Sequence, residues 1–132
     1  MDNSLVIILK RIVKILPSDW NKMVFSVFAR ECVVNGKKSY SKEFKCLVLT
    51  DSYDLPLDLV KVYDEDYDTT DLFFELLNYL YKNYLVDKEV SNFVIFKLFN
   101  DGNYELNKIH LDDDTSNSDI LDLTTHFLNK NE

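Results

Sequence analysis

Two histidines, His110 and His126, and two cysteines, Cys32 and Cys46, are the side chains of this sequence best suited to nucleophilic or zinc chemistry. They are dispersed along the chain, and no pair has the spacing of a zinc site. The two glycines stand alone in turn-like segments, which excludes a phosphate-binding loop. A Ser–His–Asp or Cys–His arrangement can assemble from distant residues, so the sequence leaves that alternative open. Because no local motif favours catalysis, we expect a protein that is not an enzyme and that uses no cofactor.

Clustered carboxylates raise the question of a cation site. Asp64, Asp66 and Asp68 alternate as the first ligands of an EF-hand calcium loop do. Counted from Asp64, the position that requires glutamate holds Glu75, but the position that requires glycine holds Thr69. Because the glycine is missing and the segment continues as a helix, we expect no metal site here.

Acidic residues are segregated from basic ones along the chain. Residues 51–71 contain eight carboxylates against one lysine, Lys61, and residues 112–122 add five carboxylates and no base. An acidic surface speeds encounter with a basic protein, and interleaved tyrosines supply desolvated anchors. The alternative is an ordinary solvated face that serves solubility. We expect a basic macromolecular partner, and the candidate partner-binding residues are Asp54, Asp58, Asp64, Glu65, Asp66, Tyr67, Asp68, Asp112, Asp113 and Asp114.

The overall composition narrows the function classes further. The 132 residues carry a net charge of −8, whereas free-standing nucleic-acid binders are basic because they neutralise phosphates. The same charge repels an anionic membrane surface. The apolar run at residues 5–9 is too short for a membrane span and has no signal-peptide cleavage site after it. With 46% apolar residues, the sequence predicts a single folded domain over residues 1–132, in the cytoplasm, with neither nucleic acid nor membrane as partner.

The elements that must position these residues begin with an N-terminal helix. Apolar residues recur at helical spacing over residues 5–16. Asn3 or Ser4 would cap this helix, and Pro17 would end it because proline has no backbone N–H. Trp20, the only tryptophan, is expected to fill the gap between the helix and a sheet.

A long hairpin is predicted next. Residues 23–34 and 39–50 alternate as strands do, on either side of the turn signal Asn35-Gly36. Cys32 and Cys46 fall on these neighbouring strands, where they could face each other as buried thiols. We expect a solvated strand face or a protected sheet edge at the hairpin's lysines, which are Lys37, Lys38, Lys42 and Lys45.

The second half of the sequence predicts the rest of the sheet and two more helices. A short strand or helical turn is expected at residues 57–63, and a helix at 70–83. Strands at 93–99 and 104–111 would form a second hairpin, and a last helix would begin at 116–118, capped by its serine. The sequence therefore predicts an α+β fold, in which an antiparallel sheet of about four to five strands packs against an N-terminal, a middle and a C-terminal helix.

Three features of the chain, spread over residues 5–114, resemble the YezG-like (DUF600) immunity protein family of bacterial polymorphic toxin systems. The first is the helix that ends in Ile15-Leu16-Pro17-Ser18-Asp19-Trp20 and passes into a strand. The second is a Leu/Phe-rich helix at 72–84 after an acidic loop. The third is the hairpin Phe93-Val-Ile-Phe-Lys-Leu-Phe-Asn-Asp-Gly-Asn-Tyr-Glu, followed by the acidic residues 112–114.

The resemblance implies an antitoxin, which binds a cognate toxin stoichiometrically and has no catalytic residues of its own. A nuclease toxin needs a basic surface to hold phosphates, and an acidic protein can cover that surface. The first alternative is an acidic adaptor or chaperone-like binding module of a toxin secretion system. The second is a small enzyme, which predicts a closed pocket lined by His110 or His126 and by paired carboxylates.

Overall fold

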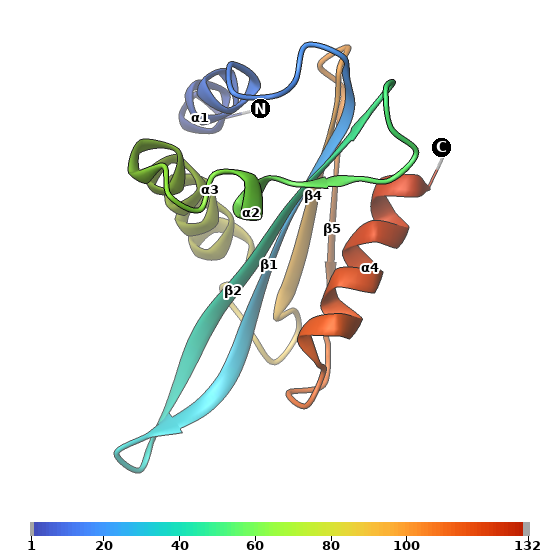
Figure 1. Cartoon of the computed structure of the whole chain (residues 1–132). Coiled ribbons are helices and arrows are strands. Elements are labelled where there is room, and N and C mark those ends of the chain that lie inside the picture. The colour runs from blue at the N-terminus through green and yellow to red at the C-terminus, as the bar shows by residue number, and fades with distance from the viewer. Residues whose placement is uncertain (1, 131–132) are drawn as a thin grey trace.

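The computed structural model describes residues 2–130, which form one five-stranded antiparallel sheet with helices on both faces (Figure 1). The strand order is β3-β2-β1-β4-β5. The strands are β1 (Trp20–Val34), β2 (Lys37–Thr50), β3 (Leu57–Asp58), β4 (Phe93–Phe99) and β5 (Tyr104–Ile109). The α+β fold expected from the sequence is therefore confirmed.

The helices divide the molecule into three layers (Figure 1). Their bounds are α1 (Asn3–Val13), α2 (Leu59–Val62), α3 (Tyr67–Tyr84) and α4 (Asn117–Asn129). The first three lie on one face of the sheet, where Phe25 and Phe96 of the strands pack with Phe73 of α3. On the other face, Ile120 and Leu128 of α4 bury Val24, Phe28, Leu47, Phe93 and Ile95. Because both faces are covered, β1 and β4 are apolar on both sides rather than alternating.

The β1–β2 hairpin is longer than the rest of the sheet. Its two-residue turn places Asn35 at φ 51° and Gly36 at φ 76°, as a type I′ turn requires. Pairing between β1 and β4 stops at Phe28, and β3 pairs with only Leu47 and Val48 of β2. The outer half of the hairpin therefore projects beyond its neighbours (Figure 1), and the lysines of β2 lie along a sheet edge as expected.

The N-terminal helix differs from its prediction at both ends. Its N-cap is Asp2, whose carboxylate accepts the backbone N–H of Ser4 at 2.7 Å, and neither Asn3 nor Ser4 has this role. The helix ends at Val13, before Pro17, because the chain turns there and places Leu16 in the core. Capping depends on which residue leaves the helical conformation first, and neighbouring polar residues compete for that position.

The two cysteines do not face each other. In the β1–β2 register Cys32 lies opposite Ser39, and Cys46 lies opposite Phe25. Cys46 is completely buried in the core on the face covered by α1, α2 and α3, whereas Cys32 is half-buried, and both thiols are free. Side chains alternate between the faces of a strand, so Cys32 shares the α4 side with Phe28. The prediction of a buried thiol is therefore correct for Cys46 only.

The remaining boundaries shift by a few residues. The middle helix begins three residues earlier than predicted, at Tyr67, because Asp66 caps it. The segment at 57–63 contains both predicted alternatives, the strand β3 and the short helix α2. The capping of α4 by Ser116 is confirmed, since its hydroxyl accepts the backbone N–H of Asp119. Within residues 2–130, no helix has the length and apolar character needed to cross a bilayer.

Candidate partner-binding site

Residues 62–68, which we call the acidic shoulder, join α2 to α3 and carry five of the ten candidate residues. Two aspartates start these helices. The Asp58 carboxylate accepts the backbone N–H of Val60 at 3.1 Å, and the Asp66 carboxylate accepts that of Thr69 at 3.1 Å. Both carboxylates therefore stabilise helix N-termini and complement their dipoles.

The other acids of the shoulder do not cap a helix, although Asp68 lies in the first turn of α3. Asp64, Glu65 and Asp68 are exposed, and within residues 2–130 they form no ion pair and no side-chain hydrogen bond. Around them residues 62–68 line an open hollow of about 640 Å³. Two largely apolar side chains lie beside these carboxylates and are accessible to solvent: Tyr67 is 83% exposed and Val62 is 58% exposed. The shoulder thus offers negative charge beside apolar anchors.

A hydrogen bond to the segment that follows α1 holds the shoulder in place. The hydroxyl of Tyr63 donates to the backbone carbonyl of Ile15 at 2.8 Å, and the backbone N–H of Asp66 donates to the carbonyl of Tyr63 at 3.1 Å. Leu59 is buried in the core on the same face of the sheet. A surface that is ordered before binding loses less entropy when a partner docks on it.

Asp54 lies elsewhere, in the loop that connects β2 to β3. Tyr53 and Leu55 flank it and are 64% and 78% exposed. In Figure 1 this loop projects away from α2 and from the start of α3, so it is not continuous with the shoulder.

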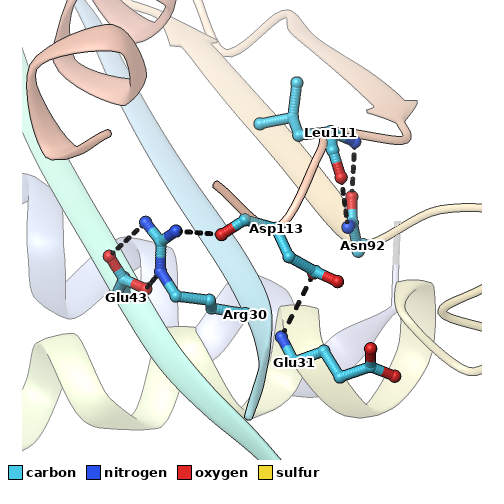
Figure 2. A network of polar contacts seen from close by, with 6 residues as sticks. All are labelled: Arg30, Glu31, Glu43, Asn92, Leu111 and Asp113. Atoms are coloured by element: carbon cyan, nitrogen blue, oxygen red, sulfur yellow. Dashed lines mark hydrogen bonds and ion pairs between the residues drawn. The ribbon is translucent and has the colours of Figure 1, made fainter. Parts of the chain in front are cut away.

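Asp112, Asp113 and Asp114 form a third site, in the connection between β5 and α4. Figure 2 shows how Asp113 fastens this connection to β1: its carbonyl accepts from the Arg30 guanidinium, and its carboxylate accepts the backbone N–H of Glu31 at 3.4 Å. The flanking Asp112 and Asp114 are exposed. One member of this run therefore has a structural role.

Further hydrogen bonds of Arg30 and Asn92 hold the connection between β5 and α4 in place (Figure 2). Arg30 donates two hydrogen bonds to the Glu43 carboxylate, at 2.6 and 3.2 Å, and its guanidinium lies 4.8 Å from the centre of the Phe28 ring. These bonds to Glu43 raise the pKa of Arg30. The buried amide of Asn92 pairs with both backbone groups of Leu111. Backbone groups of Leu111 that would otherwise extend β5 bond to Asn92 instead, so β5 ends at Ile109, earlier than predicted.

The shoulder and the 112–114 run are separate surfaces. Asp58, at the entrance to α2, lies opposite Leu47, whose partner on β1 is Val24. Asp113 instead contacts Arg30, six positions farther along β1, which corresponds to roughly 20 Å at about 3.3 Å per residue. The ten candidate residues therefore do not form one patch, and the shoulder holds the largest group of them.

His110 lines a small, partly open cavity of about 120 Å³ together with carboxylates, whereas the enzyme alternative predicts a closed pocket. Two of those carboxylates, Glu31 and Glu89, form ion pairs with Lys38 at 2.7 and 3.6 Å. The hydrogen bond from Lys38 lowers the pKa of Glu31, which favours the ionised form over a proton donor. At about 30 Å³ per water, the cavity has room for a few waters.

The other potential chemical groups are dispersed. His126 is on α4, with its ring against Phe127. Within residues 2–130, no three His, Cys, Asp or Glu side chains come together as a metal site would require. Val62 is part of the shoulder but was not among the candidate residues predicted from the sequence. Its apolar side chain in an acidic segment, between Lys61 and Tyr63, is the signal that could have identified it.

The chain matches no model of a known protein family and no curated protein sequence.

Proposed function

We propose that this protein is an immunity protein, an antitoxin that binds a cognate nuclease toxin domain stoichiometrically and blocks its action. The acidic shoulder is the proposed contact surface. The observation that carries the proposal is the group of exposed carboxylates of Asp64, Glu65 and Asp68, which have no partner among residues 2–130, around the exposed ring of Tyr67. The resemblance to the YezG-like family supports the same function, and the cytoplasm of the producing cell is the proposed location.

The charge of the acidic shoulder favours a basic partner. Carboxylates that have no internal counter-ion attract a cationic surface over about a Debye length, roughly 8 to 10 Å at physiological salt. A nuclease must present lysines and arginines to its nucleic-acid substrate, so its substrate-binding surface is complementary to the shoulder. Desolvated aromatic side chains carry much of the energy at interfaces, and Tyr67 is placed to act in this way.

Copurification tests the partner's identity. The tagged protein, expressed in its native host, is expected to retain one basic toxic domain at equal stoichiometry. Recovery of several unrelated partners, with binding that salt hardly weakens, would favour the secretion adaptor instead. Turnover of a substrate by the purified protein would favour the enzyme.

Association kinetics test the contact surface. The triple variant Asp64→Asn/Glu65→Gln/Asp68→Asn is expected to lower the association rate on the order of tenfold at low salt and to flatten its salt dependence. The matched control Glu105→Gln/Asp119→Asn/Asp122→Asn removes the same charge from positions that are not candidate partner-binding residues. Asp66 is left intact because it caps α3. Equal rates for the two triple variants would exclude the shoulder as the contact surface.

A further inference from the structure

An apolar groove lies between α1 and the β4–β5 turn, and none of its lining residues belongs to the acidic shoulder. Its volume is about 630 Å³, within the range of roughly 300 to 1,000 Å³ typical of small-ligand sites. The apolar side chains that line it are Val6, Leu9, Val13, Trp20, Leu98 and Phe99.

The groove forms because α1 packs against α3 and leaves space between itself and the β4–β5 turn. The buried stripe of α1 belongs to the core that it shares with α3, and Arg11 forms an ion pair with Glu75 of α3 at 2.8 Å. On the other side the β4–β5 turn is held against the start of β1, where the backbone N–H of Asn100 donates to the carbonyl of Asn21 at 3.1 Å. Trp20 is half-buried between these two supports and leaves the space beside it open.

Two lysines flank the groove. Lys10 and Lys14 are four residues apart on α1 and therefore share a face of the helix. Both are exposed, and within residues 2–130 neither forms an ion pair or hydrogen bond. In a protein with a net charge of −8, an apolar groove with two unpaired cations at its rim is complementary to an anion with an apolar body.

We propose that this groove binds a soluble anionic amphiphile, namely a carboxylate with an aliphatic or aromatic body. The apolar body contacts Trp20, Val13 and Leu98, and the anionic group lies between Lys10 and Lys14. This inference is independent of the proposed antitoxin function, because it concerns other residues and the opposite sign of charge.

The only tryptophan of the chain provides the measurement, since Trp20 lines the groove. Titration with decanoate below its micelle concentration is expected to change the fluorescence of Trp20 saturably, with one site by calorimetry. Neutral decanol is expected to bind at least tenfold more weakly, because it lacks the charge. No saturable change, or equal affinity for decanol, would overturn the proposal.

Variants locate the site. Lys10→Gln/Lys14→Gln is expected to weaken decanoate binding at least tenfold while leaving decanol binding unchanged. The matched control Lys37→Gln/Lys61→Gln removes the same charge from exposed positions elsewhere and is expected to bind decanoate normally. Val6→Phe/Val13→Phe fills the groove and is expected to abolish binding of both compounds. Equal loss in the two lysine variants, or binding to anionic vesicles without binding to free decanoate, would contradict the assignment.

Discussion

The aspartates near the start of α2 and α3 differ in what their oxygens bind. Asp58 and Asp66 accept backbone N–H groups and belong to the fold, whereas Asp64 is exposed and has no partner within residues 2–130. One stretch of acidic sequence therefore combines structural carboxylates with carboxylates that are free to meet a partner. This division decides which substitutions test binding and which test stability.

Asp66→Ala is expected to destabilise the protein by about 1 kcal/mol, because the first turn of α3 loses its cap. Asp64→Ala removes the same charge from a residue that does not cap a helix. It is expected to change the free energy of unfolding by less than about 0.5 kcal/mol. Urea unfolding monitored by circular dichroism measures both. Identical midpoints would show that the Asp66 cap contributes nothing.

The two thiols are expected to react very differently. Burial raises the pKa of Cys46, so its thiol stays protonated and shielded in the folded protein even at mildly alkaline pH. A chromogenic disulfide reagent at pH near 8 is therefore expected to label half-buried Cys32 first and Cys46 only after denaturation. Cys32→Ser should remove the fast reaction. Rapid labelling of both thiols in the native protein would contradict the buried position of Cys46.

At the scale of elements, α4 is joined to the sheet by buried polar contacts as well as by its apolar face. The hydroxyls of Ser26 on β1 and Thr124 on α4 lie 3.0 Å apart, and both residues are buried. About one turn farther along, at the C-terminal end of the helix, the amino group of buried Lys97 donates to the carbonyls of Phe127 and Lys130. These contacts fix the position of α4 along β1 and β4, which apolar packing alone specifies less strictly.

A double-mutant cycle tests the Ser26–Thr124 contact. Thr124→Val is expected to cost about 1 to 2 kcal/mol, because it leaves the buried Ser26 hydroxyl without its partner. Ser26→Ala is expected to cost less, because the Thr124 hydroxyl keeps its hydrogen bond to the Ile120 carbonyl at 2.7 Å. The double variant is expected to cost less than the sum, with a coupling of about 1 kcal/mol in urea unfolding. Strict additivity would show that the two hydroxyls do not interact.

At the scale of the whole molecule, packing is uneven along the β1–β2 hairpin. Residues 23–29 of β1 are buried on both faces, whereas Val33 and Val34 near the turn are 74% and 53% exposed. Arg30, Glu31 and Asp113 connect the middle of the hairpin to the β5–α4 connection (Figure 2). Beyond that point the contacts outside the two strands are exposed ones, such as the ion pair of Lys38 with Glu89 and the contact of Lys88 with the Tyr40 ring.

Amide hydrogen exchange is expected to follow this gradient. Amides of residues 23–28 should exchange at least tenfold more slowly than those of residues 32–39, because local opening near the turn exposes little apolar surface. Exchange measured by NMR resolves the two halves of the hairpin. Uniform protection along β1 and β2 would indicate that the projecting half is held by contacts absent from this arrangement.

Much of the fold followed from local patterns. The Asn35-Gly36 turn, the Ser116 cap and the apolar β4 strand each depend on neighbouring residues, so short-range sequence signals were sufficient. Errors occurred where residues compete for one role, as at the start of α1, or where a distant side chain intervenes, as Asn92 does at the end of β5.

The candidate site, like the fold, was predictable from the sequence only in part. The sequence by itself determined that the protein is acidic, that its charge is segregated and that its element order is α+β, because composition and periodicity are properties of the chain. Only the tertiary structure decided that Asp113 bonds to β1 while Asp64 has no partner in the described part of the chain, and that Lys10 and Lys14 flank an apolar groove. Those relations depend on contacts between residues far apart in the chain, and the packing of the helices on the sheet sets them.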